Sequence, residues 1–333
     1  MKAPRKSTLF TSAVLVSALA LTACGGGQRD NAAGSDADAS SCESGSGQIS
    51  IATGNSTGVY YVVGGGLAKI IGDKTDLKAT AAETGASVQN IEQLVSGDYD
   101  VAFSLADTAA DAVEGKSSFT SKQNVSALGR IYSNYTQVVV RKDSGITSIA
   151  DFKGKRISTG SPKSGTEVIA ERLIDAAGLK KGDVSQQRLD LTKTIDGMKD
   201  GSIDGFVWSG GLPTPALTDL FTSSRGKVEF VDTMALLPDL QKISPVYEKA
   251  TIPAATYKTD ADLDVIAVPN VLLVSDDMPD NQACALAKVT FDSKDELSTV
   301  HPSGAEIDPA NALDSGPIPI HPGAKKAIDE LVK

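Results

Sequence analysis

The chain has 333 residues, a formal net charge of −10 and 41% hydrophobic residues. This length is sufficient for two domains that each bury a core of their own. The sequence has no basic stripe with interleaved aromatic residues, which argues against a nucleic acid as a partner. It has no CxxC or other metal-ligand spacing, and its only histidines, His301 and His321, each precede a proline, which argues against a zinc site or a catalytic triad.

Residues 1–23 have the pattern of a secretory signal. A basic start is followed by an apolar run over 9–20, which is too short to span a bilayer as a retained helix. The run leads into Leu-Thr-Ala before Cys24, and this order resembles the lipobox of bacterial lipoproteins, in which the cysteine is lipidated and becomes the mature N-terminus. We therefore expect an extracytoplasmic protein that is lipid-anchored to a bacterial membrane. The alternative is a secreted protein whose cysteine lies at the cut site by chance.

Residues 24–48 are rich in Gly, Ser, Ala and Asp and contain almost no large apolar side chain. Such a segment cannot bury enough surface to offset its chain entropy, so we expect a flexible tether. The two remaining cysteines, Cys42 and Cys284, are an even pair that can form a disulfide outside the cytoplasm. The alternative is two free thiols.

After the tether, strand and helix patterns alternate. We expect strands at 49–52, 77–82 and 99–105, with helices at 59–71 and 87–95 between them. This βαβαβ order predicts a parallel sheet with right-handed crossovers.

A second series of alternating elements follows. It comprises strands at 156–159, 187–191 and 203–208 and helices at 166–177 and 195–199. Its segment 200–206 is similar to 96–103, since each follows an amphipathic helix and leads into an apolar strand. Two similar α/β lobes explain this repeat, and the alternative is a chance similarity of short Gly-Asp turns.

Two further segments, 125–142 and 265–274, are rich in β-forming residues, and we expect them to cross between the lobes. Helices expected at 282–300 and 325–333 would then complete the first lobe. The predicted domains are 49–135 with 265–333 as lobe 1 and 136–264 as lobe 2. The predicted fold is α/β, with each lobe a mainly parallel sheet flanked by helices and with a two-stranded hinge that allows closure on a ligand.

Three turns rich in Gly, Ser and Thr precede helices, at 53–61, 83–87 and 160–167. Ligands of open parallel sheets bind beyond the carboxyl ends of the strands, where helix N-termini offer unpaired N–H groups and a partial positive charge. We therefore expect a cleft between the lobes that binds a small carboxylate-bearing ligand. The predicted ligand-binding residues are Asn55, Tyr60, Gly85, Ala86, Ser87, Ser161, Ser164, Gly165, Thr166, Trp208 and Thr214.

Each of these features also has a purely structural explanation. The turns can serve ordinary helix capping, Trp208 can pack in a core, and Lys163 can be a solvated surface residue instead of a charge beside the ligand. No turn matches a phosphate-loop pattern, and Ser164 has no histidine in the cleft segments that would activate it as a nucleophile. These observations predict a binding protein with no cofactor and no metal.

Six motifs, taken in order, resemble the TAXI family of TRAP-transporter solute receptors. They are Gly-Val-Tyr-Tyr at 58–61, Glu-Thr-Gly-Ala-Ser at 83–87, Ser-Pro-Lys-Ser-Gly-Thr-Glu at 161–167, Leu-Pro-Thr-Pro at 212–215, Thr-Ile-Pro-Ala-Ala-Thr-Tyr at 251–257 and Pro-Ile-Pro-Ile-His-Pro-Gly at 317–323. The resemblance runs from about residue 49 to the C-terminus. Val59 and Ala86 depart from the family pattern, in which threonine and glycine are usual at these positions.

The resemblance implies a periplasmic-binding-protein fold, no enzymatic turnover, and a TRAP membrane permease partner driven by an ion gradient. It implies a small, often anionic ligand such as a glutamate-like amino acid or a 2-oxo acid; we also expect a dicarboxylate to be possible, and a monomeric receptor. Two other function classes remain open. One is a receptor of the same fold that serves an ATP-driven importer or acts as a sensor, and the other is an enzyme.

Overall fold

The structure is a computed structural model that describes residues 42–180 and 182–333. The predicted signal peptide, the predicted lipidation site Cys24 and most of the predicted tether lie outside the described residues. Within the described ranges, no helix combines the length and the apolar character needed to cross a membrane.

The first part of the described chain folds as the predicted βαβαβ unit, and we call it lobe 1. Its elements are β1 (Gly47–Ala52), α1 (Val59–Lys74), β2 (Leu77–Ala82), α2 (Ser87–Val95), β3 (Val101–Leu105) and α3 (Ala106–Glu114). The strands pair in parallel in the order β2-β1-β3, and the central strand buries Ile49 and Ile51. The strand β1 begins at Gly47, inside the segment predicted as tether, and α3 had not been predicted.

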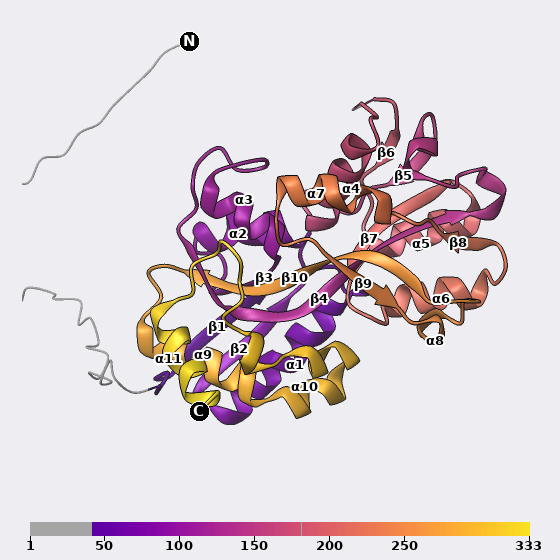
Figure 1. Ribbon diagram of the computed structural model, residues 1–333. Coiled ribbons are helices and arrows are strands. Elements are labelled where there is room, and N and C mark those ends of the chain that lie inside the picture. The colour runs from indigo at the N-terminus through magenta and orange to yellow at the C-terminus, as the bar shows by residue number, and fades with distance from the viewer. Residues whose placement is uncertain (1–41, 181) are drawn as a thin grey trace, which may run out of the picture. The chain divides into compact units, whose positions relative to one another are not determined.

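Two long strands, β4 (Val125–Arg141) and β10 (Leu263–Ser275), connect the strands of lobe 1 to a second group of parallel strands. They pair with each other in antiparallel orientation, while β10 also pairs with β3 and β4 also pairs with β7 (Figure 1). Both strands are buried along most of their length, which fits their runs of β-branched residues such as Val138–Val140. The two-stranded connection expected between the lobes is therefore confirmed.

The second part of the chain, which we call lobe 2, has its strands in the parallel order β7-β5-β6. Its elements are β5 (Arg156–Ser158), α4 (Gly165–Ala176), β6 (Ser185–Gln187), α5 (Leu191–Asp200), β7 (Gly205–Gly210) and α6 (Pro215–Ser223). They are followed by β8 (Val228–Phe230) beside β4, α7 (Leu237–Ile243), β9 (Glu248–Ile252) beside β10, and α8 (Ala254–Tyr257).

The prediction of a strand over 187–191 is wrong at its C-terminal end. The strand β6 ends at Gln187, and α5 begins at Leu191 instead of at 195. The cause is local, because the Asp190 carboxylate accepts a hydrogen bond from the Lys193 N–H at 2.8 Å and so caps the helix.

Of the last helices, α9 (Asp280–Asp292) and α10 (Lys294–Val300) lie beside α1 at lobe 1, and α11 (Pro322–Leu331) packs on α9 (Figure 1). The single helix predicted over 282–300 is broken at Ser293, which leaves the helical conformation at φ −111° and ψ 26° and whose hydroxyl accepts a hydrogen bond from Lys74 Nζ. The helix α11 begins earlier than predicted, because His321 Nδ1 accepts a hydrogen bond from the Gly323 N–H and caps it.

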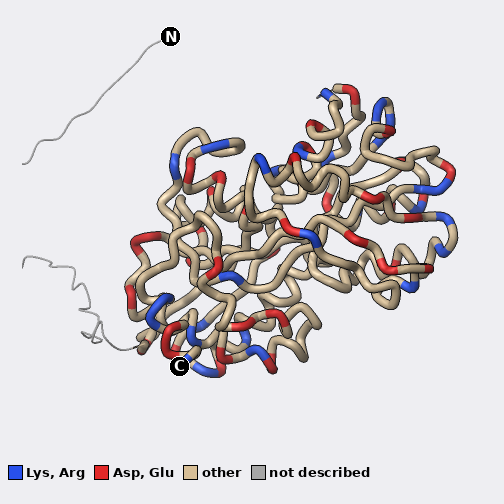
Figure 2. Tube along the Cα trace, viewed as in Figure 1, with Lys and Arg blue, Asp and Glu red and all other residues tan. Residues whose placement is uncertain are grey.

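Two close contacts tie lobe 1 together. Cys42 and Cys284 form a disulfide with their Cα atoms 5.0 Å apart, which joins the segment before β1 to α9. A Cβ atom on Gly64 would lie 2.5 Å from Thr53 Cγ2, so only glycine lets α1 pack this closely on the end of β1. On the described chain as a whole, Lys and Arg are interspersed with Asp and Glu (Figure 2).

Candidate ligand-binding site

A cavity of about 30 Å³ lies between lobe 1 and lobe 2. One water molecule needs roughly 10–15 Å³ of space accessible to a water-sized sphere, so the cavity can hold about two water molecules. A larger solute does not fit in this space as it stands. The lining residues are Gly54, Asn55, Gly58, Val59, Tyr60, Gly85, Ala86, Ser87, Leu105, Asn134, Ser161, Ser164, Gly165, Thr166, Trp208, Ser209 and Gly210.

Three helices direct their N-termini at this cavity: α1 and α2 from lobe 1 and α4 from lobe 2. Within the described chain, the backbone N–H groups of Ser87, Gly165 and Thr166 have no hydrogen-bond partner. No Lys, Arg, Asp or Glu side chain is among the lining residues, so the charge at the cavity wall is the partial positive charge of the helix N-termini.

Ala86, at the start of α2, has φ of 81°, a backbone conformation that favours glycine. This strain is located at the edge of the cavity, where Ala86 directs the chain into the N-terminus of α2. The turn at Ala86 therefore aims the N-terminus of α2 at the cavity.

The structure brings all of the predicted ligand-binding residues to the cavity wall except Thr214. Thr214 lies behind the wall, fully buried, and its hydroxyl accepts a hydrogen bond from Trp208 Nε1 at 3.1 Å. Whether the lining residues bind a ligand stays a prediction. What the structure adds is that three turns far apart in the sequence lie around one space.

Sequence reasoning missed two buried amides: Asn134, which lines the cavity, and Asn270, which is hydrogen-bonded to it. The Tyr60 hydroxyl donates to Asn270 Oδ1 at 2.6 Å, Asn270 Nδ2 donates to Asn134 Oδ1 at 2.9 Å, and Asn134 Nδ2 donates to the Ser209 carbonyl at 3.1 Å. Burial raises the pKa of the Tyr60 hydroxyl well above its ordinary value, so it stays protonated and donates.

This chain of hydrogen bonds runs from α1 through β10 and β4 to β7, and it therefore connects lobe 1 to lobe 2 through the hinge strands. The signal in the sequence was a single asparagine within each β-rich crossing segment, where apolar residues dominate. Ser209 also lines the cavity, and its hydroxyl oxygen is buried without a partner among the described residues.

Asn55 joins the two lobes across the mouth of the cavity. Its Nδ2 lies 3.1 Å from Ser161 Oγ, its Oδ1 lies 3.2 Å from the same hydroxyl, and Oδ1 also accepts from the Leu191 N–H at 3.0 Å. Since both ends of the amide have partners in lobe 2, Asn55 acts between the lobes in this arrangement, in addition to lining the cavity.

Lys163 also contacts the opposite lobe and does not line the cavity. Its Nζ lies 2.7 Å from Glu92 Oε2, and its carbonyl accepts a hydrogen bond from the Gln89 N–H at 3.0 Å. The Lys163 charge is thus used in an exposed ion pair between the lobes.

The hydroxyl and imidazole groups that could serve nucleophilic catalysis have structural partners. Ser164 Oγ accepts from the Glu167 N–H at 3.0 Å and caps α4. Both ring nitrogens of His301 contact backbone groups, and so do those of His321. Among the described residues, no group of three or more His, Cys, Asp or Glu side chains is arranged to bind a metal ion.

The sequence model of the NMT1-like family matches residues 51–331. The chain belongs to the NMT1-like family. A solved protein of Bordetella bronchiseptica RB50 is similar to it with a TM-score of 0.55 and 19% identity, over 85% of this chain and 88% of that chain. The binding protein component of an ABC phosphonate transporter from Pseudomonas aeruginosa is similar with a TM-score of 0.52 and 12% identity, over 78% of this chain and 79% of that chain.

At these levels of identity the similarity concerns the fold. The NMT1-like chain has the periplasmic-binding-protein fold, in which two mainly parallel α/β lobes are joined by crossing strands, as predicted. The cavity between its lobes lies beyond the carboxyl ends of the strands, where open α/β sheets bind their ligands.

Proposed function

We propose that this NMT1-like protein is an extracytoplasmic solute-binding receptor that captures a small carboxylate-bearing metabolite between its lobes and delivers it to a membrane transporter. The observation that carries this proposal is the convergence of three helix N-termini, from both lobes, on one cavity that is too small to admit a metabolite without opening. Reproducible chemical turnover of a bound metabolite would contradict it.

The ligand class follows from the donors at the cavity. A carboxylate accepts hydrogen bonds from several N–H groups at once, and the free N–H groups of Ser87 in lobe 1 and of Gly165 and Thr166 in lobe 2 provide them. A glutamate-like amino acid, a 2-oxo acid or a dicarboxylate offers such a group.

For the transporter, the six motifs that resemble the TAXI family support a TRAP permease driven by an ion gradient. The similarity in fold to a component of an ABC transporter supports a second candidate, an ATP-driven importer. The neighbouring genes distinguish them, since a large multi-span TRAP permease gene supports the first and an ATPase gene supports the second.

For the location, we propose a lipid anchor at Cys24 outside the cytoplasm. The lipobox-like sequence supports the anchor. The Cys42–Cys284 disulfide supports the compartment, because disulfides persist outside the cytoplasm. The variant Cys24→Ala should be released from membranes into the soluble fraction. A variant that stays membrane-bound would contradict the anchor.

The function is tested by a thermal-shift screen of amino acids, 2-oxo acids and dicarboxylates, followed by calorimetry. A true ligand at about a hundredfold its dissociation constant should add roughly 2.7 kcal/mol to the free energy of unfolding. No shift with any carboxylate, together with a shift for a neutral or cationic solute, would contradict the proposed ligand class.

Closure of the lobes is tested by Gly165→Ala. The added methyl would lie 2.5 Å from Leu105 Cδ1 and 2.7 Å from Ser87 Oγ, both in the opposite lobe, so it should keep the lobes apart and weaken binding at least about tenfold. The matched control is Gly65→Ala in α1, where an added methyl has no neighbour within 4 Å. Equal affinity of the two variants would contradict closure at this site.

Ser87 and Thr166 are less suitable targets for this test. The Ser87 hydroxyl accepts from the Leu105 N–H at 3.1 Å, and the Thr166 hydroxyl accepts from the Ser209 N–H at 3.3 Å. Alanine at either position would remove a hydrogen bond to the backbone of a buried strand, so it would change the stability of the fold as well as the site.

A further inference from the structure

Trp208 is the only tryptophan of the chain, and it forms part of the cavity wall at the end of β7. Its indole ring lies against the start of α1 in the opposite lobe. A Cβ atom on Gly58 would be 3.3 Å from Trp208 Cζ2. The orientation of this one ring therefore determines the shape of the cavity beside the N-terminus of α1.

The indole is held by Thr214, six residues further along the chain. Trp208 Nε1 donates to Thr214 Oγ1 at 3.1 Å, and Thr214 Oγ1 in turn donates to the Gly211 carbonyl at 2.9 Å. Because a hydroxyl has one proton to donate, its bond to Gly211 leaves the oxygen free to accept the indole N–H. In this orientation of the ring, the indole N–H and the Thr214 hydroxyl thus both have a hydrogen-bond partner.

Thr214 is itself fixed from two sides. Its backbone N–H donates to the Tyr257 hydroxyl at 2.9 Å, and burial raises the pKa of Tyr257 to about 12, so that hydroxyl stays protonated. The preceding Pro213 carbonyl lies 3.0 Å from His301 Nε2 of the segment after α10. Since His301 Nδ1 accepts from the Ser303 N–H, Nε2 is the protonated nitrogen that donates to Pro213.

We propose that Thr214 is a positioning residue for the ligand cavity: its hydroxyl fixes Trp208 as a rigid wall, although Thr214 itself does not reach the ligand. The proposal rests on the proposed function, since it concerns the same cavity. Without the hydroxyl, the indole loses its partner and can leave the orientation that packs against Gly58.

The test compares Thr214→Val, which keeps the shape and the backbone N–H but removes the hydroxyl, with Thr214→Ser, which keeps the hydroxyl. Tryptophan emission and its quenching by acrylamide report on Trp208 alone, and both can be measured without any ligand. We expect Thr214→Val to have a red-shifted emission and stronger quenching, and Thr214→Ser to behave like the original protein. A Thr214→Val protein with unchanged emission and quenching would overturn the proposal.

Affinity is then measured by calorimetry with L-glutamate, 2-oxoglutarate and succinate as probes. Thr214→Val should weaken binding of the strongest probe about tenfold, and Thr214→Ser should stay within about twofold. In a Trp208→Phe background, which lacks the indole N–H, Thr214→Val should have no further effect, and a full additional loss there would overturn the proposal. If none of the probes binds the original protein, the proposed ligand class fails, while emission and quenching still decide the role of Thr214.

Discussion

Two arginine–aspartate networks in this protein have similar hydrogen-bond distances and very different surroundings. One joins Arg172 of α4 to Asp107 and Asp111 of α3, and thus joins lobe 2 to lobe 1. The other joins Arg156 to Asp204 within lobe 2. The comparison separates the effect of burial from the effect of the ion pair itself.

In the first network, the Arg172 side chain is 9% exposed and Asp107 is fully buried. Arg172 Nη1 lies 2.8 Å from Asp107 Oδ2 and 2.9 Å from the Tyr247 hydroxyl, Nη2 lies 2.5 Å from Asp111 Oδ2, and the Tyr247 hydroxyl donates to Asp107. Burial raises the pKa of Asp111, and the Arg172 charge opposes this shift. One cation thus compensates two carboxylates at the contact between the lobes.

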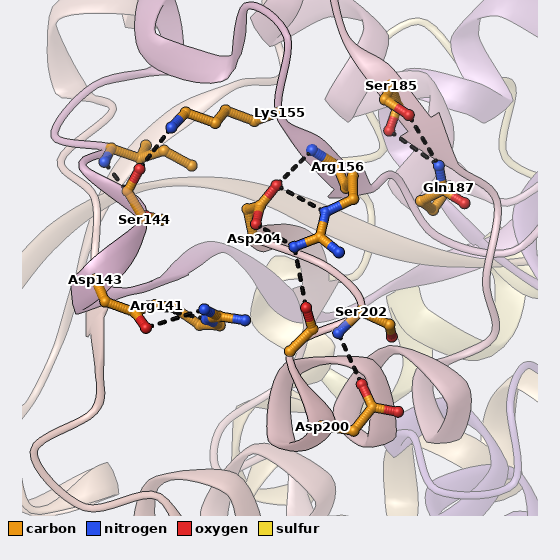
Figure 3. A network of polar contacts seen from close by, with 12 residues as sticks. Arg141, Asp143, Ser144, Lys155, Arg156, Ser185, Gln187, Asp200, Ser202 and Asp204 are labelled. Carbon is orange, nitrogen blue, oxygen red and sulfur yellow. Dashed lines mark hydrogen bonds and ion pairs between the residues drawn. The ribbon is translucent and has the colours of Figure 1, made fainter.

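In the second network, the Arg156 side chain is 44% exposed. Its backbone N–H and Nε both donate to Asp204 Oδ2, at 2.8 and 3.1 Å, and Nη2 donates to Asp204 Oδ1 and to the Gly201 carbonyl. Around it, Arg141 pairs with Asp143 and Lys155 donates to the Ser144 carbonyl (Figure 3). Water reaches this network, so the loss of one partner can be compensated by solvent.

The number of hydrogen bonds in each network therefore does not indicate how much that network contributes to stability. Buried charges are costly unless each has a partner, whereas exposed charges keep most of their hydration. The buried network also lies within one continuous core that includes apolar residues of both α3 and α4. Breaking it should therefore affect the stability of the whole molecule and the contact between its lobes.

The largest effect is expected for Arg172→Met, which leaves Asp107 and Asp111 buried without their cation. We expect the free energy of unfolding to fall by about 3–5 kcal/mol, measured by urea denaturation. As a control, Asp107→Asn added to Arg172→Met should recover part of the loss, because one buried charge is then removed. A loss below about 1 kcal/mol for Arg172→Met would show that solvent reaches the cluster.

A smaller loss, about 1–3 kcal/mol, is expected for Tyr247→Phe, because Asp107 then loses a hydroxyl donor to its buried charge. The matched control is Tyr135→Phe, since the Tyr135 hydroxyl has no hydrogen-bond partner within the described chain. The same urea denaturation applies, and equal effects of the two variants would contradict a role for the Tyr247 hydroxyl.

The smallest effect is expected for Arg156→Ala, a decrease in Tm of at most about 2 °C at pH 7. Hydrogen bonds from Arg156 hold the pKa of Asp204 below its ordinary value, so the unfolded chain binds this proton more readily. The contribution to stability is therefore present at neutral pH and is lost as the pH falls through the folded pKa, below about 3.9. Calorimetric scans of both proteins from pH 7 to pH 3 should converge, and a difference that is constant with pH would contradict this assignment.

Much of the fold and part of the candidate site could be predicted because their signals are local. The alternation of strand and helix patterns indicated two α/β lobes, and the Gly-, Ser- and Thr-rich turns indicated where helices begin. Ser164 caps α4 within three residues of its own position, and Asp190 caps α5 in the same way. Such preferences act over a few residues, so the sequence alone contains them.

Other features depended on which distant segments meet. Arg172 contacts Asp107 and Tyr247, 65 and 75 residues away, and no local pattern pairs them. Asn134 and Asn270 are 136 residues apart, and only the antiparallel pairing of β4 and β10 places one beside the other.

Thr214 illustrates which features follow from the local sequence and which depend on tertiary contacts. The sequence determined that it lies in a turn after β7, because Pro213 and Pro215 surround it, and that it follows the only tryptophan. Only the tertiary structure decided that Thr214 lies behind Trp208 and not at the cavity, since that depends on contacts with Tyr257 and, through Pro213, with His301. Local conformational preferences set where the chain turns, but the packing of segments from both lobes sets which side of the turn faces the ligand.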